Sequence, residues 1–271
     1  MSVKGKTIII TGASRGVGRA IALKCAADGA NIVLAAKSVA EGKLPGTIHS
    51  VAEEVRAAGG QALPLQVDVR FEDQVCAMVE ATVSKFGGID VLINNAGAIW
   101  LKPLIETPPK KMDLVMGVNV RATLLCTQAA LPYLQKAGGA HVLNLSPPLS
   151  YDPKWLNGHV TYTISKYGMS LATLGLAEEL KEYKIAVNSL WPRTAIATAA
   201  VNWMLGDAGM QQSRTPAIMA DAAYEILNGD STVTGNLFID ETLLREKGVT
   251  DFKHYSVDPT QELMLDLYVE E

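Results

Sequence analysis

Short runs of β-branched and aliphatic residues alternate with longer segments of helical periodicity along most of the chain. This alternation is typical of a parallel sheet whose crossover helices cover both of its faces. The runs with the length of buried strands are Thr7–Thr11, Asn31–Ala36, Gln61–Val67, Val91–Asn95, His141–Ser146, Ile185–Trp191 and Asn236–Ile239. The intervening segments with helical periodicity are Arg15–Asp28, Thr47–Ala58, Asp73–Phe86, Lys110–Leu134, Tyr162–Tyr183 and Pro216–Leu227. We therefore expect an α/β fold: a single-domain, Rossmann-like, doubly wound sheet of about seven parallel strands with helices on both faces.

The length of 271 residues, of which 48% are hydrophobic, suits one domain with a sizeable core. Two segments interrupt the alternation of strands and helices: the insertion Lys37–Gly46 and the polar segment Asp251–Glu271. The insertion follows the second strand, in a position to line a ligand site. We expect residues 251–271 to form a C-terminal surface extension and no separate domain, because about 20 residues cannot bury a core of their own.

Composition and charge exclude several classes of function. The formal net charge of −4 lacks the basic excess that binding to a phosphate backbone requires, so we expect no nucleic-acid partner. No apolar run approaches the roughly 20 residues of a membrane span, and Ile8–Ile10 is too short for a signal peptide. We expect a cytoplasmic protein without a membrane span. The spacing of the three cysteines predicts free thiols, and the scattered histidines predict no metal site. The residues are Cys25, Cys76, Cys126, His49, His141, His159 and His254.

A glycine-rich turn follows the first predicted strand. Thr11–Gly18 reads TGASRGVG, a GxxxGxG spacing that opens a predicted helix. The free N–H groups at a helix start bind phosphate, and glycines permit a tight turn and a close approach of the backbone. The spacing departs from the GxGxxG pattern of dinucleotide sites, and glycine-capped turns also occur without a ligand. We interpret the segment as a dinucleotide-binding loop with the candidate contacts Gly12, Ser14, Arg15, Gly16, Val17 and Gly18.

The end of the second predicted strand favours NADP(H) over NAD(H). Dinucleotide sites place an acidic residue there for a ribose 2′-hydroxyl or a basic residue for a 2′-phosphate. This strand ends at Lys37 without a carboxylate, and Arg15 lies in the glycine loop. The alternative is that both cations are solvated surface residues. Asp68, followed by Val69 after the third strand, is a candidate acceptor for the adenine amine or, alternatively, a cap of the next turn.

Tyr162 and Lys166 lie four residues apart, on one face of a predicted helix. A phenol has a reference pKa of about 10, so it needs a neighbouring cation to exchange a proton readily near neutrality. Lys166 supplies that cation. The pair follows a strand that ends at Ser146, in a type of sheet that binds ligands at its carboxyl edge. A tyrosine and a lysine at this spacing also occur by chance on helix surfaces, so the register decides the interpretation.

These features occur in one order along the chain together with further polar positions. The glycine loop is followed by Asn94-Asn95-Ala96-Gly97, Asn119, Ser146 and the Tyr162/Lys166 pair. In this combination the chain resembles the short-chain dehydrogenase/reductase family. The resemblance extends over nearly the whole chain to the dehydrogenase domain of one group of members, whose longer forms append a sterol-carrier domain that we do not expect here. That narrower resemblance rests on residues 144–148, 162–170 and 190–196.

The resemblance implies an NADP(H)-dependent oxidoreductase that interconverts a secondary alcohol and a ketone, with residues 1–250 as dinucleotide-binding and catalytic domain. Tyr162 would be the general acid in reduction and the base in oxidation. Lys166 would lower the pKa of Tyr162 and hold the nicotinamide ribose, and Asn119 would bind a water that links Lys166 to solvent. Ser146 would bind the substrate oxygen, and Asn94 would tie neighbouring strands together. The other implied cofactor contacts are Asn95, Ala96, Gly97, Pro192, Thr194 and Ile196.

Two features bear on the substrate. Ser146 and Tyr162 are separated by more residues than is usual in the family, and Pro147-Pro148 follows the serine, so the loop between them is enlarged. The segment Thr194–Gln212, rich in Ala and Met and containing Trp203, is predicted to form an apolar lid. A lid of this composition favours a lipophilic alcohol or ketone, although the same segment could pack against a neighbouring subunit.

Other functions stay open at this point. The alternative enzyme is a 3-oxoacyl-thioester reductase, and the alternative outside the enzymes is a non-catalytic NADP(H)-binding sensor or interaction module. A sensor has no need of a proton-transfer pair, and Ser146 lacks the GxSxG context of a hydrolase nucleophile. The predicted helices Lys110–Leu134 and Tyr162–Tyr183 carry apolar residues beyond those that face the sheet. With the family resemblance, they predict a homodimer or homotetramer.

Overall fold

The computed structural model describes residues 2–40, 42 and 45–270, and within them seven strands form one parallel sheet. The order across the sheet is β3-β2-β1-β4-β5-β6-β7. The strands are β1 Thr7–Thr11, β2 Asn31–Ala36, β3 Gln61–Gln66, β4 Val91–Asn94, β5 Ala140–Asn144, β6 Ile185–Trp191 and β7 Leu237–Ile239. The strand order reverses at β1 and β4, which creates a crevice at the carboxyl edge where ligands bind in this architecture.

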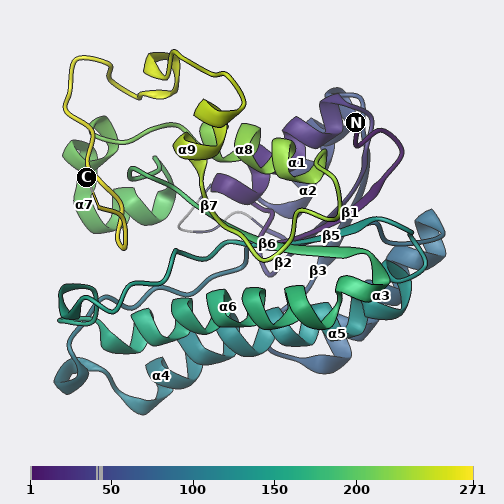
Figure 1. Ribbon diagram of the computed structural model, residues 1–271, viewed down its shortest axis with the longest axis horizontal. Helices are drawn as coiled ribbons and strands as arrows, with labels where there is room; N and C mark the ends of the chain where they lie inside the picture. Colours follow the sequence, from purple (N-terminus) through teal and green to yellow (C-terminus); the bar gives the residue numbers. More distant parts are fainter. Residues whose placement is uncertain (1, 41, 43–44, 271) are drawn as a thin grey trace.

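Helices cover both faces of the sheet, α1, α2, α8 and α9 on one and α3, α5 and α6 on the other (Figure 1). Their bounds are α1 Gly16–Ala27, α2 Ile48–Ala57, α3 Glu72–Phe86, α4 Pro109–Val115, α5 Ala122–Leu134, α6 Val160–Glu179, α7 Ala199–Gln211, α8 Ala217–Leu227 and α9 Asp240–Glu246. A π-helical turn, Met116–Arg121, joins α4 to α5. Short 3-10 turns occur at Leu104–Glu106, Pro153–Trp155, Lys181–Tyr183 and Lys253–Tyr255. The expected doubly wound α/β fold is confirmed.

The strand sequences explain why both faces are covered. Ile8 and Ile10 of β1 belong to the core layer of α1 and α8, whereas Ile9 between them belongs to the layer of α3 and α5. All three side chains are fully buried, and burial of each contributes roughly 1.5–3 kcal/mol. Pro64 lies in β3, at the edge of the sheet, where its missing N–H group disrupts no further pairing.

The seven expected strands are all present, and their ends differ from the expected ones by at most two residues. The expected helix Lys110–Leu134 is instead the succession of α4, the π-helical turn and α5. The helices α7 and α9 were not expected. Residues 41, 43 and 44 of the expected insertion Lys37–Gly46 lie outside the described residues.

One helical stretch in the described part of the chain, Pro109–Leu134, has the length and hydropathy of a membrane-spanning helix. By this criterion, the expectation that no apolar run approaches that length was wrong. Its buried residues include Cys126, Ala130 and Leu134, which pack in the core layer against the sheet. Packing of this kind accounts for the apolar composition of the stretch.

The C-terminal segment is not the surface extension that the sequence predicted. Phe252 and Tyr255 are buried in the core layer that contains α8 and α9. Tyr268 is buried against Trp191, with ring centroids 6.0 Å apart, and its hydroxyl lies 3.1 Å from Thr163 Oγ1. The segment leaves α9, arches over one end of the molecule and returns beside α7 (Figure 1). It therefore ends at the carboxyl edge of the sheet, beside the crevice.

Candidate active site

The glycine loop lies at the crevice between β1 and β4. Gly12 and Gly16 have φ values of 70° and 56°, in the left-handed region that favours glycine. A Cβ at Gly12 would lie 2.9 Å from Asn95 Nδ2, and a Cβ at Gly18 would lie 2.5 Å from the same atom. This nitrogen donates to the Thr11 carbonyl at 2.8 Å. The glycines thus allow Asn95 to brace the loop, and they leave the N-terminus of α1 accessible to a phosphate.

A cavity of about 390 Å³ extends from this loop past the ends of β2 and β3. Many of the predicted cofactor contacts line it: Gly12, Ser14, Arg15, Lys37, Asp68, Val69, Asn95, Ala96 and Gly97. Gly16 and Gly18 do not line it, because they belong to the first turn of α1. The residues present therefore fit the adenosine half of a dinucleotide.

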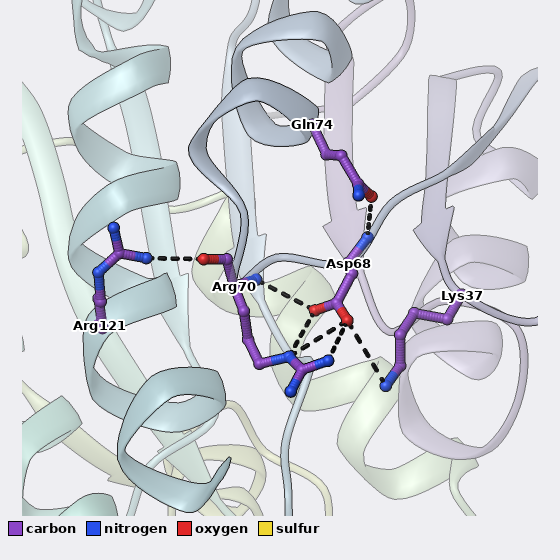
Figure 2. A network of polar contacts seen from close by, with 5 residues as sticks. All are labelled: Lys37, Asp68, Arg70, Gln74 and Arg121. Atoms are coloured by element: carbon purple, nitrogen blue, oxygen red, sulfur yellow. Dashed lines mark hydrogen bonds and ion pairs between the residues drawn. The ribbon is translucent and has the colours of Figure 1, made fainter. Parts of the chain in front are cut away.

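Figure 2 shows a network of charges where β2 and β3 end. Arg70 donates to both oxygens of Asp68, with distances of 2.9 Å from Nε to Oδ1 and 2.5 Å from Nη2 to Oδ2. These hydrogen bonds, with a smaller contribution from Lys37, hold the pKa of Asp68 below its ordinary value. Lys37 Nζ lies 3.9 Å from Asp68 Oδ2, so β3 brings a carboxylate close to the end of β2 although the second strand itself ends without one. An adenine amine bound at Asp68 would share this carboxylate with Arg70.

Arg15 ties the insertion after β2 to the glycine loop. Its guanidinium donates to Ser38 Oγ at 3.0 Å, to the Gly46 carbonyl at 2.9 Å and to the Pro45 carbonyl at 3.1 Å. Ser38 also lines the 390 Å³ cavity. The described part of the insertion therefore contributes to this site, as its position after the second strand predicted.

Helix α6 places Tyr162 and Lys166 one turn apart, and both side chains are buried. Lys166 Nζ donates to the Leu145 carbonyl at 2.7 Å and lies 5.1 Å from the ring centroid of Trp191. Burial lowers the pKa of Lys166 to about 8, against the opposing charge of Asp266. Burial also raises the pKa of Tyr162 well above its ordinary value. The family resemblance implied a lowering, but an amine bonded to Leu145 does not offset the desolvation of the phenol.

Two hydroxyl groups at the crevice are buried without a hydrogen-bond partner in the part of the chain that the structure describes. They are Ser146 Oγ, two residues after β5, and Thr194 Oγ1, in the loop after β6. An unsatisfied buried hydroxyl costs roughly 1–3 kcal/mol, and native structures keep few of them. Both positions were predicted to contact a ligand, and their unmet hydrogen bonds fit an oxygen-bearing substrate and a nicotinamide cofactor.

Two asparagines join elements around the site. Asn119, in the π-helical turn, accepts from the Ala98 N–H at 2.8 Å and donates to Ser165 Oγ at 2.8 Å. Its side chain thus connects the loop after β4 with α6, and its expected role in a water relay stays a prediction. A π-helical turn inside a helix frequently marks a functional position. Asn94 Nδ2 donates to Asn144 Oδ1 at 2.9 Å, so it ties β4 to β5 as expected.

A second cavity, of about 410 Å³, opens beside Tyr162. Five predicted cofactor residues line it: Val17, Asn95, Tyr162, Pro192 and Ile196. Helix α7 forms the apolar lid expected between Thr194 and Gln212, through Ala200, Val201, Met204 and Leu205. Trp203 does not contribute, because its side chain is 79% exposed and lies outside the lining.

The C-terminal segment builds another wall of this cavity. The Asp266 N–H donates to the Arg193 carbonyl at 3.0 Å, and Trp191 Nε1 donates to the Leu267 carbonyl at 2.8 Å. Sequence reasoning missed these residues. The available signal was the run LMLDLYV at 263–269, which is apolar except for one aspartate and stands within a polar segment.

The family model described as short chain dehydrogenase matches residues 6–204 of this chain. The chain belongs to the short-chain dehydrogenase family. Hydroxysteroid dehydrogenase-like protein 2 of Bos taurus is 56% identical over 269 residues, which make up 98% of this chain and 64% of that protein. The narrower resemblance seen in residues 144–148, 162–170 and 190–196 was to the dehydrogenase domain of this same protein, and it is confirmed. The chain thus spans less than two thirds of the length of this relative.

Solved structures of short-chain dehydrogenases share the fold over most of their length. A short chain dehydrogenase from Mycobacterium thermoresistibile is 49% identical, with a TM-score of 0.95 over 99% of this chain and 96% of that one. L-Sorbose reductase from Gluconobacter frateurii, crystallised with NADPH and L-sorbose, is 26% identical, with a TM-score of 0.79 over 88% and 96% of the two chains. Membership in this family confirms the expected class of enzyme, a short-chain dehydrogenase/reductase.

Proposed function

We propose that this short-chain dehydrogenase is an NADP(H)-dependent oxidoreductase that interconverts a secondary alcohol and a ketone on a lipophilic substrate. One observation supports the proposal above the others: Tyr162, with Lys166 one turn behind it, lines a cavity that Val17 of the glycine loop and Asn95 of the loop after β4 also line. A phosphate-binding loop and a proton-transfer pair thus share one crevice.

Each polar group of the site has a role in this reaction. When bound, the nicotinamide cofactor supplies the hydride in reduction and accepts it in oxidation. In reduction Tyr162, whose raised pKa keeps the phenol protonated at neutral pH, donates its proton to the ketone oxygen. Ser146 Oγ donates a hydrogen bond to the same substrate oxygen. Lys166, held beside the Leu145 carbonyl, binds the ribose hydroxyls and replaces the proton that Tyr162 gives up.

The charges at the ends of β2 and β3 support NADP(H) as the cofactor. Arg15, Lys37 and Arg70 outnumber the carboxylate of Asp68, which leaves a local formal charge of +2. A 2′-phosphate brings close to two negative charges at neutral pH, whereas a 2′-hydroxyl brings none. Asp68 is bonded to Arg70 through both oxygens, so it is poorly placed to grip a 2′-hydroxyl.

We further propose a homodimer or homotetramer in a reducing cytoplasm. Helices α5 and α6 expose large apolar side chains on neighbouring surfaces: Leu124, Ile164, Leu171 and Leu174. Apolar patches of this kind mark contacts between subunits more often than free surface. The reducing compartment is supported by Cys76, which is a free and exposed thiol.

The decisive experiment combines a substrate panel with Tyr162→Phe. Ketones and alcohols from steroids to 3-oxoacyl thioesters are followed by the absorbance of the reduced cofactor. Tyr162→Phe should lower turnover by at least about a hundredfold while the Kd of NADPH changes less than about twofold. Tyr151→Phe, an exposed tyrosine outside both cavities, is the matched control and should have wild-type turnover.

Three results would overturn parts of this proposal. A Tyr162→Phe enzyme with most of its turnover would exclude Tyr162 as the acid. Turnover restricted to acyl thioesters would identify the protein as a 3-oxoacyl-thioester reductase. Tight NADPH binding without turnover of any compound would identify it as a non-catalytic module.

A further inference from the structure

Asp266 adds one carboxylate to the mostly apolar lining of the substrate cavity. The walls from α7 and from the loop after β4 present aliphatic and thioether side chains, among them Ile99, Leu101 and Met204. Among the described lining residues, Tyr162 and Asp266 alone carry ionisable side chains. The proton-transfer reaction requires Tyr162. It does not require Asp266, so this aspartate needs an explanation of its own.

The backbone fixes Asp266 in this position. Its N–H donates to the Arg193 carbonyl at 3.0 Å, and Met264 on the same wall accepts from the Ala195 N–H at 2.9 Å. Trp191 Nε1 donates a hydrogen bond to the Leu267 carbonyl, and Lys166 Nζ lies over the ring of the same tryptophan. Asp266 is therefore part of the rigid cavity wall and shares its support with the catalytic pair.

The carboxylate of Asp266 is only half satisfied. Oδ1 accepts from the Leu267 N–H at 2.7 Å. No hydrogen bond or ion pair from residues 2–40, 42 or 45–270 reaches Oδ2. The nearest lysine in the site, Lys166, is bonded to the Leu145 carbonyl instead. Because Asp266 lines the cavity and is partly accessible, its second oxygen can form a hydrogen bond with a group of a bound ligand.

A hydroxyl group matches this carboxyl in either protonation state. Burial, together with the charge of Asp240, raises the pKa of Asp266 to about 7 in spite of Lys166, so both states are populated near neutrality. The ionised form accepts a hydrogen bond from a hydroxyl, and the protonated form donates one to it. A substrate carboxylate or phosphate in the same place would be repelled by the ionised form.

We propose that Asp266 is a specificity residue that binds a second hydroxyl group on the substrate, so that the preferred substrates are lipophilic ketones or secondary alcohols with an additional hydroxyl. This inference rests on the proposed oxidoreductase function and narrows its substrate class. Sites that hydrogen-bond a substrate hydroxyl discriminate strongly against analogues that lack it, because their own polar group is then left unpaired.

The test uses a straight-chain methyl ketone, its monohydroxy derivatives that differ in hydroxyl position, and one derivative with a terminal carboxylate. For wild type we expect kcat/KM of the best hydroxyketone to exceed that of the parent ketone by about tenfold or more. A ratio of this size corresponds to one well-placed hydrogen bond. Asp266→Leu should reduce this ratio to about one, and Asp266→Asn, which keeps a donor and an acceptor, should retain part of it. The carboxylate derivative should be the poorest wild-type substrate.

Binding provides an independent readout. Without a nicotinamide cofactor the ketone cannot be reduced and a secondary hydroxyl cannot be oxidised, so calorimetry of the hydroxyketone and of its parent gives Kd values free of chemistry, and their ratio should follow the kinetic one. Asp251→Asn is the matched control, because Asp251 is exposed in the same C-terminal segment, outside the cavity, and among the described residues it accepts a hydrogen bond from the Lys253 N–H alone. This control should keep the wild-type ratio.

Two outcomes would overturn the inference: a ratio near one in wild type for every hydroxyl position, or an equal loss for parent and hydroxyketone in Asp266→Leu. The second outcome would mean that Asp266 acts on Tyr162 rather than on the substrate. If no ketone is turned over while the hydroxyketone still binds better through Asp266, the proposed reaction fails and the binding site stands. If ketones are turned over without any preference for a hydroxyl, the reaction stands and the inference fails.

Discussion

Removal of the Lys37 side chain tests the cofactor preference most directly. Lys37→Ala leaves the end of β2 in place, together with Arg15 and its three hydrogen bonds to the insertion. A charge-assisted hydrogen bond to a phosphate contributes roughly 1.5–3 kcal/mol when it is shielded from water. The Lys37 side chain is 61% exposed, and exposed ion pairs contribute about 1 kcal/mol at most. We therefore expect the Kd of NADPH to rise about fivefold.

The assay is a fluorescence titration of NADPH and NADH against wild type and the variant. The Kd of NADH should change less than about twofold, because NADH lacks the phosphate that Lys37 would bind. The NADPH effect should shrink as salt is added, since exposed charges are screened. Lys85→Ala, an exposed lysine on α3 away from both cavities, should change neither Kd. Tighter binding of NADH than NADPH by wild type, or equal weakening of both in Lys37→Ala, would refute the charge argument.

Three further predictions concern stability and assembly. Gly18→Ala should lower the free energy of unfolding by about 1–3 kcal/mol in urea titrations, because its Cβ would lie 2.5 Å from Asn95 Nδ2. In the control Gly175→Ala on α6, the added Cβ meets none of the described atoms within 4 Å, so the free energy of unfolding should not fall. Asp266 has its pKa raised to about 7, so the native state keeps a proton that the unfolded chain releases above about pH 4, and stability should fall as pH rises through this window. Asp266→Asn should flatten this fall in stability only in part, because the pKa of Asp240 is also raised, to about 6. A fall in the stability of Asp266→Asn between pH 4.5 and 7.5 as steep as that of wild type would contradict this prediction. Leu171→Glu, at a 59% exposed position on α6, should reduce the mass seen by light scattering, while Ile105→Glu, at a 95% exposed position, should not; an unchanged mass in both would remove α6 from the interface.

The strands and the glycine loop were predictable because their signals are local. Residues Ile8 to Ile10 form an apolar run bounded by turn residues, and two glycines of TGASRGVG, Gly12 and Gly18, occupy positions where a Cβ would clash with Asn95. The contact between Lys37 and Asp68 could also have been predicted from the sequence. Both residues lie at the ends of β2 and β3, which pair with Ala36 opposite Gln66, so adjacency of the two strands brings the residues together.

The missed features depend on contacts between distant parts of the chain. Helix α9 has only seven residues and starts directly after β7, so its pattern is too short to show helical periodicity. The upward pKa shift of Tyr162 arises from burial by Trp191, Tyr268 and their neighbours, which no spacing within α6 encodes. The same holds for Asp266, whose position depends on the Arg193 backbone more than 70 residues earlier in the chain.

The wall formed by residues 264–267 sets the order in which the protein can acquire its activity during synthesis. The glycine loop, Tyr162 and Lys166 are all translated long before this wall, and the strands from β1 to β6 can pair as the ribosome proceeds. The pocket beside Tyr162 stays open on this side until Met264–Leu267 has left the exit tunnel and has formed hydrogen bonds with the loop after β6. A nascent chain stalled before this point would contain the dinucleotide-binding loop and the proton-transfer pair, yet it would have no enclosed place in which to hold a substrate.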